Sequence, residues 1–208
     1  MNNSTWISTA LGHPSNLRPF KHSFSNVEQE KNGLKWAQRN LEGDPLSANF
    51  FPSEIWGIKS ARESNYKPPN IFAAGSFWVV STAVADVLRE FDLGSGGLFP
   101  VKVMKKDRAT PIDGEWFCIN FGNRKSAICP DSSKNIYYDY IRNGEKGWFL
   151  MAKAQDDDVA VSSSALVGPA IWIDPDVGDG FFLSEALGNA LKKAKVAKGF
   201  FLLKCRAV

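Results

Sequence analysis

The chain has 208 residues, 44% of them hydrophobic, and its 25 Lys and Arg against 22 Asp and Glu leave a net charge of +3. This composition excludes a disordered protein, and so small a net charge gives no reason to expect nucleic-acid binding. The chain lacks a run of roughly 20 apolar residues, a secretion signal and metal-ligand cysteine spacing, so we expect a cytoplasmic protein without membrane contact.

The first part of the chain predicts an irregular arm. Residues 1–26 are polar, contain Pro14 and Pro19, and show few apolar residues at a regular period. His13 and His22 lie in this arm with no second ligand or base at a recognisable spacing. We therefore expect an extended or irregular segment with solvated histidines.

A short helix and a winding connection are expected next. The segment Val27–Leu41 is charge-rich and places Leu34 and Ala37 at a helical interval, which predicts a short surface helix. Prolines recur over residues 43–76, where they remove amide donors and interrupt regular ladders. We expect this connection to carry only brief strands, such as Glu54–Ile58, and to be held on the core by its aromatic residues.

Two later stretches repeat one pattern: an apolar strand, a serine, an amphipathic helix, a glycine and a second apolar strand. They cover about residues 77–103 and 180–206 and align without a gap, so that Ser81 and Ser184 hold equivalent positions. A serine hydroxyl before a helix accepts a hydrogen bond from an amide of the first turn, worth about 1 kcal/mol. The pattern predicts two similar strand-helix-strand units, produced either by internal duplication or by recurrence of a common α/β motif.

Further strands are expected between the two units. Leu98–Met104 and Glu115–Phe121 predict an antiparallel hairpin across a long polar loop, and both faces of the second strand are apolar enough to be covered. Shorter strands are expected at three places: Ile136–Tyr140, Trp148–Met151 and Val159–Val161. With many strands and few helices, the expected fold class is α+β, with a mostly antiparallel sheet.

Acidic residues cluster in two turns, where they could serve a metal ion or acid-base chemistry. Asp156, Asp157 and Asp158 join two expected strands, and Asp174 and Asp176 follow another. No histidine or second carboxylate pair accompanies them at a fixed spacing, and the loop spacing of an EF-hand is absent. The chain also lacks the common nucleophile, phosphate-loop, zinc and dinucleotide motifs. We therefore expect no catalytic residue, no metal site and no cofactor.

Basic residues gather at the end of the chain. From Phe181 onward there are six Lys and Arg against one acid. Lysines late in a helix interact favourably with its negative C-terminal end, which explains part of this excess. The remainder offers a positive surface to an acidic partner, and we single out Lys192, Lys195 and Lys198 as candidate partner-binding residues.

Several short motifs resemble those of a known family. They are Phe77-Trp78-Val79-Val80-Ser81, Ala85-Asp86-Val87-Leu88, Gly97-Leu98-Phe99-Pro100-Val101, Gly168-Pro169-Ala170-Ile171-Trp172-Ile173-Asp174 and Phe181-Phe182-Leu183-Ser184. Together they resemble the bacterial immunity-protein family first described from a myxobacterial gene and formerly classed as a domain of unknown function. The resemblance covers about residues 71–208.

The resemblance implies a non-enzymatic protein that binds and neutralises a cognate antibacterial toxin. Such toxins are encoded by a neighbouring gene and include effectors of contact-dependent inhibition and type VI secretion systems. The family assigns no toxin-binding residue here, so the three lysines are candidates from charge alone. Two other hypotheses stay open: a small hydrolase or modification-reversing enzyme that uses the loop carboxylates, and an adaptor that carries a toxin to its secretion machinery.

The expected organisation has two parts. Residues 1–70 form an irregular arm and a short helix packed on the core, and residues 71–208 form an α+β immunity-type domain, unless residues 1–208 make one continuous domain.

Overall fold

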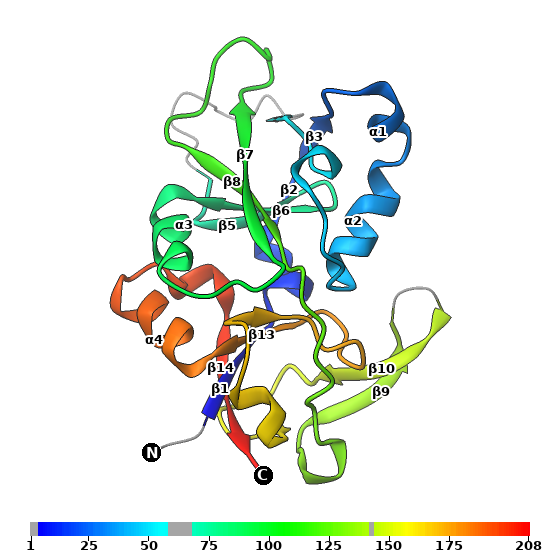
Figure 1. Cartoon of the computed structure of the whole chain (residues 1–208), viewed down its shortest axis with the longest axis vertical. Helices are drawn as coiled ribbons and strands as arrows, with labels where there is room; N and C mark the ends of the chain where they lie inside the picture. Colours follow the sequence, from blue (N-terminus) through cyan, green and yellow to red (C-terminus); the bar gives the residue numbers. More distant parts are fainter. Residues whose placement is uncertain (1–3, 58–67, 142–143) are drawn as a thin grey trace.

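The computed structural model describes residues 4–57, 68–141 and 144–208, and their strands form three sheets (Figure 1). The seven-stranded sheet, in the upper half of the figure, has the order β2 (Leu17–Arg18), β5 (Ile71–Ala74), β6 (Phe77–Ser81), β8 (Trp116–Asn120), β7 (Gly97–Met104), β4 (Glu54–Gly57) and β3 (Phe20–Ser23). The five-stranded sheet, in the lower half, has the order β11 (Ala160–Val161), β14 (Leu202–Ala207), β1 (Ser4–Ser8), β13 (Phe181–Ser184) and β12 (Ile171–Trp172). A separate pair consists of β9 (Ile136–Tyr140) and β10 (Lys146–Leu150).

Helices are few among the described residues. The α-helices are α1 (Val27–Lys31), α2 (Gly33–Leu41), α3 (Thr82–Arg89) and α4 (Glu185–Lys193). The 3-10 turns are η1 (Ala10–Gly12), η2 (Pro14–Asn16), η3 (Ala48–Phe50), η5 (Pro130–Ser132), η7 (Ser163–Leu166) and η8 (Ala197–Phe200). None of these helices has the length and apolar character that crossing a membrane requires. With 14 strands in mostly antiparallel pairs over the described ranges, the fold is α+β, as predicted.

The two large sheets repeat one arrangement. In the order β5-β6-β8-β7-β4, the first three pairings are antiparallel and the last is parallel. The order β12-β13-β1-β14-β11 has the same sequence of pairings. Helix α3 joins β6 to β7, α4 joins β13 to β14, and the two helices contact each other. The two predicted strand-helix-strand units are therefore confirmed, and their likeness extends to five strands each.

The second unit takes its central strand from the start of the chain. Strand β1 lies between β13 and β14, in the position that β8 holds in the first unit, and its five residues are all buried. The expectation of an irregular arm is wrong for this stretch. Only Trp6 and Ile7 are apolar in β1, so the partners that make it a strand lie far away in sequence and leave no local pattern.

The expected helix over residues 27–41 is broken in two. Asn32 ends α1 and precedes α2, and Leu34, expected on the apolar face, is 74% exposed. Helix α2 is instead held by a buried polar side chain. The Asn40 amide donates to Ile119 O at 2.9 Å and its carbonyl accepts from Phe121 N at 3.0 Å, which fixes α2 against the end of β8.

Strands at the margins agree with the expected positions. The brief strand expected at Glu54–Ile58 appears as β4, and Ile58 lies outside the described residues. The three shorter strands expected after the first unit appear as β9, β10 and β11. The last strand begins only at Leu202, because a 3-10 turn precedes it and Phe201 adopts a left-handed conformation with φ of 48°.

The two serines that precede α3 and α4 differ in role. The Ser184 hydroxyl accepts a hydrogen bond from Leu187 N at 3.2 Å, as predicted. Ser81 caps no amide and instead donates its hydroxyl to the side-chain carbonyl of Asn70 at 3.0 Å. The cap prediction is thus confirmed for the second unit and wrong for the first, where the hydroxyl is directed to Asn70.

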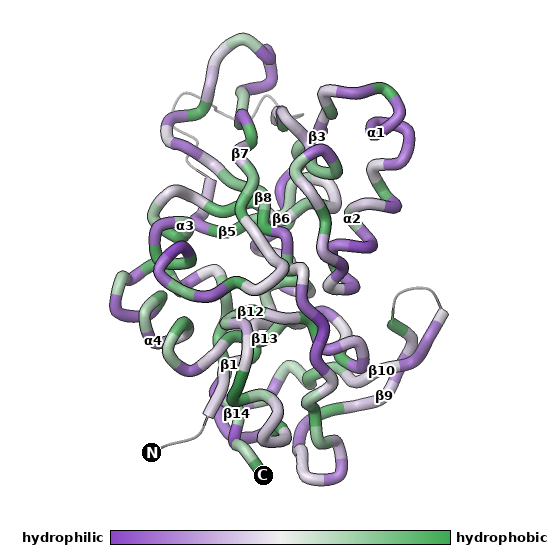
Figure 2. The backbone as a smooth tube through the Cα atoms, viewed as in Figure 1, coloured by the Kyte–Doolittle hydropathy of each residue, from purple (hydrophilic) through white to green (hydrophobic). Residues whose placement is uncertain are grey.

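Both faces of β8 are buried, as predicted. Phe117, Ile119 and Phe121 lie in the main core, which also receives residues from α3, α4 and both large sheets. Trp116 and Cys118 lie in a second core on the opposite face. Figure 2 shows hydrophobic colouring along β7 and β8, whereas α1 and α2 are mostly hydrophilic.

A third core supports the separate strand pair. Its centre is Trp172, which is fully buried and stacks on Phe182 with ring centroids 5.5 Å apart. Ile136 of β9 and Leu150 of β10 pack against this core. Trp172 is therefore a core residue, and the small pair of strands stands on a well-packed base.

Candidate partner-binding surfaces

Lys192, Lys195 and Lys198 lie together where α4 ends. Lys192 belongs to α4, Lys195 follows it with a left-handed φ of 60°, and Lys198 lies in η8. All three are exposed. The structure brings these lysines to one end of the second unit, and their role in binding stays a prediction.

Lys192 also has a packing role. Its Nζ lies 3.7 Å from the centroid of the Trp6 ring, a distance at which an ammonium group is attracted to the face of an indole. The Trp6 ring in turn lies so close to Gly188 that a side chain there would collide with it. A substitution of Lys192 therefore affects the contact between α4 and β1 as well as the surface charge.

The acidic turn at residues 156–158 bonds to its own surroundings. Asp156 Oδ1 accepts from Lys204 N at 2.7 Å, and Asp158 Oδ2 accepts from the Asn135 side chain at 2.9 Å. The bond from Asn135 is the main reason that the pKa of Asp158 lies below its usual value. The turn lies between β10 and β11, but these two strands do not pair with each other, because β10 pairs with β9 and β11 pairs with β14.

Asp174 is a buried acceptor for backbone amides. Its Oδ2 accepts from Ala127 N at 2.7 Å and Ile128 N at 2.9 Å, and its Oδ1 accepts from Asp176 N at 3.0 Å. Burial raises the pKa of the Asp174 carboxyl, while these three bonds lower it. The side chain fastens the loop after β8 to the turn after β12, and across the described residues no group of three His, Cys, Asp or Glu is arranged to hold a metal ion.

The histidines are less solvated than expected. His13 stacks on Phe201 with ring centroids 3.6 Å apart. His22 lies on β3 between Phe24 and Phe77, at centroid distances of 5.7 and 5.3 Å. Burial lowers the pKa of His22, so the expectation of a solvated loop histidine is wrong for this residue.

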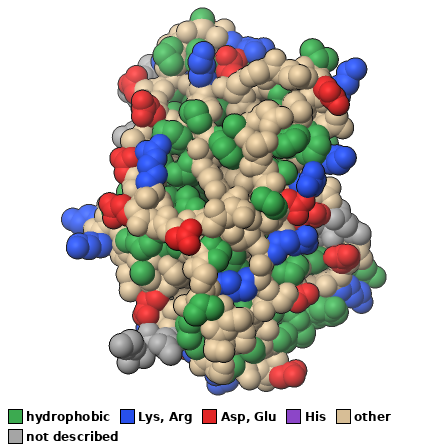
Figure 3. All heavy atoms as spheres, in the orientation of Figure 1, with side chains coloured by type: hydrophobic (Ala, Val, Ile, Leu, Met, Phe, Trp, Pro, Cys, Tyr) green, Lys and Arg blue, Asp and Glu red, His purple; other side chains and the backbone are tan. Residues whose placement is uncertain are grey.

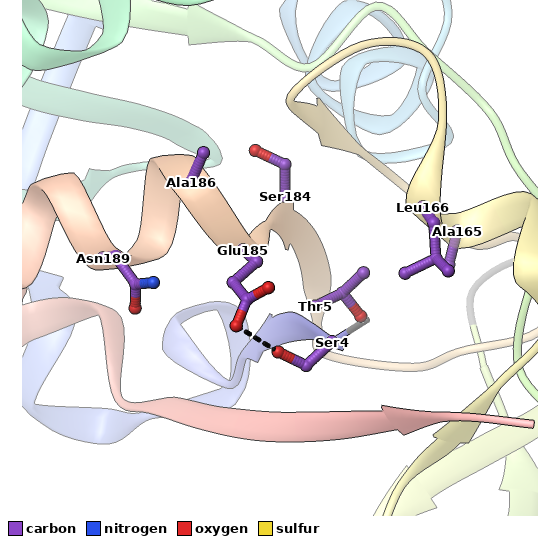
Figure 4. A pocket seen from close by; sticks show the side chains of 8 residues that line it. All are labelled: Ser4, Thr5, Ala165, Leu166, Ser184, Glu185, Ala186 and Asn189. Carbon is purple, nitrogen blue, oxygen red and sulfur yellow. Dashed lines mark hydrogen bonds between the residues drawn. The ribbon is translucent and has the colours of Figure 1, made fainter. Parts of the chain in front are cut away.

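A shallow hollow lies at the start of α4 (Figure 4). It is lined by Ser4, Thr5, Ala165, Leu166, Ser184, Glu185, Ala186 and Asn189, and its volume is about 430 Å³. The one carboxylate there, Glu185, already accepts a hydrogen bond from the Ser4 hydroxyl at 2.7 Å. With a single acid and no base in its lining, the hollow offers no acid-base pair.

The most distinctive exposed surface is the hairpin of β9 and β10, which projects from the lower right of the molecule in Figure 1. Three of the four tyrosines of the chain lie on β9. Tyr137, Tyr138 and Tyr140 are 42%, 55% and 64% exposed, and within the described part of the chain they are the only exposed large aromatic side chains. Figure 3 shows hydrophobic side chains gathered in this region of the surface.

Aromatic residues pair across the hairpin. Tyr138 lies opposite Trp148 with ring centroids 4.8 Å apart, and Tyr137 stacks on Phe149 at 5.4 Å. Such pairs stabilise neighbouring strands by roughly 0.2–1 kcal/mol each. The tyrosines are therefore held in place although they are open to solvent, which favours recognition of a partner over simple solvation.

The strand at Ile136–Tyr140 was expected from the sequence, but the exposure of its tyrosines was not. Three tyrosines within five residues, without alternation between apolar and polar positions, form the signal that was available. The pattern alone does not say whether the rings are buried. In the fold, Ile136 packs against the third core and the tyrosines are exposed.

Comparison with protein-family models gives a match that covers most of the chain. The model of the immunity protein family Imm11 matches residues 54–206, a range that begins at β4 and includes every strand of both repeated units except β1. No curated protein matches the chain.

Proposed function

Because the chain belongs to the Imm11 immunity protein family, we propose that it binds and neutralises a cognate antibacterial toxin by stoichiometric protein–protein inhibition. The toxin is the product of a neighbouring gene, and the inhibitor acts in the cytoplasm of the producing cell or its kin. The family match over residues 54–206 is the observation that carries this proposal. Delivery of the toxin by a contact-dependent or type VI secretion system is part of the same proposal.

The chemistry of the loops supports inhibition by binding more than catalysis. Asp156, Asp158 and Asp174 each accept at least one hydrogen bond from an amide of the fold. A hydrolase of this kind would bring several carboxylates, or a carboxylate and a base, together around one reacting group, and in the described residues no group of three His, Cys, Asp or Glu is placed to hold a metal ion. We therefore rank the hydrolase hypothesis below the inhibitor, and nothing on the described surface favours the adaptor.

Effective protection requires a tight complex. A dissociation constant of 1 nM corresponds to about −12 kcal/mol, and a few aromatic or arginine side chains usually supply most of it. The exposed tyrosines of β9 supply side chains of this type, and the lysines near the end of α4 supply a charge that would speed encounter with an acidic surface.

Co-expression with the product of the neighbouring gene tests the proposal. We expect growth to be restored and the two proteins to co-purify as a complex of fixed stoichiometry. A toxin expressed with an unrelated soluble protein is the control. Persistent toxicity without a complex would contradict the proposal, a complex without protection would favour the adaptor, and full protection at far less than one inhibitor per toxin would favour an enzyme.

A further inference from the structure

Strand β9 is the outer strand of its sheet. Across the described residues it pairs with β10 and with no other strand. Four of its five residues are exposed. Natural proteins usually protect such an edge with lysine, proline or a covering segment, because its free backbone groups can pair with another chain.

Hydrogen bonds at the two ends of the hairpin show which backbone groups point inward. Met151 N donates to Asn135 O, and Ile141 N donates to Glu145 O, both at 2.8 Å. Bonded pairs alternate with non-bonded pairs in an antiparallel ladder, so the odd-numbered residues of β9 bond to β10. The even-numbered residues direct their backbone groups away from β10.

These even-numbered residues are Ile136, Tyr138 and Tyr140. The Tyr140 N–H is taken by the Asp139 side chain at 2.7 Å. The N–H and C=O groups of Ile136 and Tyr138 and the C=O of Tyr140 are directed to the outer edge of β9. This spacing of donors and acceptors matches an added strand.

The other edge of the hairpin is closed. Trp148 N donates to Asp176 O at 2.7 Å, and Gly178 N donates to Trp148 O at 2.8 Å. These bonds join β10 to the turn that precedes β13, and a side chain at Gly178 would collide with the Phe149 ring. The hairpin is thus fixed to the body along β10, and β9 is the side left for a partner.

The side chains around the outer edge indicate what the partner carries. Tyr138, Tyr140, Trp148 and Lys146 share one face of the hairpin, since Tyr138 lies opposite Trp148 and Tyr140 lies opposite Lys146. Lys146 is exposed, its Nζ lies 5.1 Å from the centroid of the Tyr140 ring, and no ion pair within the described residues uses it. This face therefore complements an extended segment with apolar side chains and a carboxylate beside Lys146.

We propose that the cognate toxin docks on the outer edge of β9 by adding an extended strand of its own, with Tyr138 and Tyr140 against its side chains and Lys146 beside one of its carboxylates. The inference rests on the proposed function, since it names the surface by which the toxin is held. Backbone pairing supplies general affinity in such complexes, and the side chains on the shared face supply specificity.

Binding measurements with the purified product of the neighbouring gene, inactivated in its catalytic site, test the inference. The double variant Tyr138→Ala/Tyr140→Ala should weaken binding at least about tenfold. Truncation of tyrosines at the centre of an interface commonly costs more binding free energy than the 1.4 kcal/mol that a tenfold change represents. The matched control is Leu34→Ala, which removes an exposed aliphatic side chain from α2 and should leave affinity unchanged. Lys146→Glu should weaken binding and reduce its salt dependence.

Two measurements address the backbone contact separately. Tyr138→Pro removes one outward N–H as well as the tyrosine ring, while the ladder with β10 keeps its bonds, so it should weaken binding more than Tyr138→Ala does, with little effect on folding. Hydrogen exchange on the unaltered protein gives a second readout. The Tyr138 amide should exchange readily in the free protein and become protected in the complex, whereas the Tyr137 amide, bonded to β10, should change less.

The outcomes separate this inference from the proposed function. If the unaltered protein binds the toxin and every hairpin variant binds within about twofold of it, the docking surface is wrong and the immunity function stands. If the unaltered protein does not bind at all, both are wrong. If the hairpin variants instead convert a dimer of this chain to a monomer without changing toxin affinity, a second copy covers β9 and the inference is overturned.

Discussion

The Asp174→Ala substitution separates a structural carboxylate from a catalytic one. In the fold this side chain accepts three hydrogen bonds from backbone amides, those of Ala127, Ile128 and Asp176, at 2.7, 2.9 and 3.0 Å. Alanine removes both carboxylate oxygens and with them all three hydrogen bonds. A structural role predicts a loss of stability, whereas a catalytic role predicts a stable protein without activity.

The size of the loss follows from the burial of the three donors. Ala127 is 2% exposed, Ile128 is partly buried and Asp176 is exposed, so water can replace the lost acceptor only at the last of them. A buried donor without an acceptor costs about 1–3 kcal/mol, which gives about 2–4 kcal/mol for one full and one partial penalty. Removing a buried charge offsets part of this, since burial raises the pKa of Asp174. We expect a net decrease of about 1–3 kcal/mol in the free energy of unfolding, or about 3–10 °C in Tm.

Urea unfolding followed by tryptophan fluorescence measures this difference. The matched control is Asp176→Ala, which removes an exposed carboxylate from the same turn and should change stability by less than about 0.5 kcal/mol. The slope with denaturant should be the same in both variants. Equal stability of the two variants would refute the structural role, and loss of toxin protection by a fully stable Asp174→Ala protein would favour an enzyme.

Other predictions address charge, pH and domain organisation. Replacing Lys192, Lys195 and Lys198 with glutamate should slow association with the toxin and flatten its salt dependence in surface-binding kinetics, and unchanged rates would reject a role in binding. Because the Lys192 ammonium covers the buried Trp6 indole, Lys192→Glu alone should also lower the free energy of unfolding by about 0.5–1 kcal/mol. Burial lowers the pKa of His22 below its usual 6.5, so the stability gained from the neutral ring is present above that pH and is lost as pH falls through the lower folded pKa; His22→Gln should remove this part of the pH dependence in urea unfolding, and an unaltered profile would contradict it. Residues 71–208 expressed alone should be insoluble or unfolded, because β13 and β14 would lose the strand between them; a soluble, cooperatively unfolding fragment would support a separate domain.

Local sequence patterns predicted those elements whose structure depends on residues close in sequence. The units around Ser81 and Ser184 change from a strand period to a helical period within a few residues, and β8 has apolar residues on both faces. Such features depend on neighbouring residues and survive in the fold. The break at Asn32 was harder to place, because the buried amide of Asn40, and not a hydrophobic stripe, positions α2.

Strand β1 could not be predicted because its environment comes from the other end of the chain. Ser4, Thr5 and Ser8 look like loop residues, yet all are buried. The Ser8 hydroxyl donates to Phe200 O at 2.7 Å, and Ser4 donates to Glu185. These partners satisfy polar groups that would otherwise oppose burial, and no reading of residues 4–8 alone contains them.

The candidate site was difficult for a different reason. Charge pointed to the lysines at the end of α4, and one of them proves to cover Trp6. Strand β9 is as rich in aromatic residues as a core strand, so its sequence does not show whether the tyrosines pack in the core or are exposed to a partner. What distinguishes them is exposure, which depends on how the hairpin stands on the third core.

The comparison of the two units gives this exposure its meaning. In the first unit, the segment between β1 and β4 folds back, so that β3 pairs with β4 and covers that edge of the sheet. The corresponding segment of the second unit, between β8 and β11, contains β9 and β10 and projects away from the body (Figure 1). The strands and helices of the two units match, and the need to form the same fold explains this match. It does not explain why β9 and β10 project while β3 covers an edge of its sheet. A rigid scaffold that repeats while one connection departs from the repeat is the arrangement in which binding residues are most often found, and here the departing connection carries the exposed tyrosines.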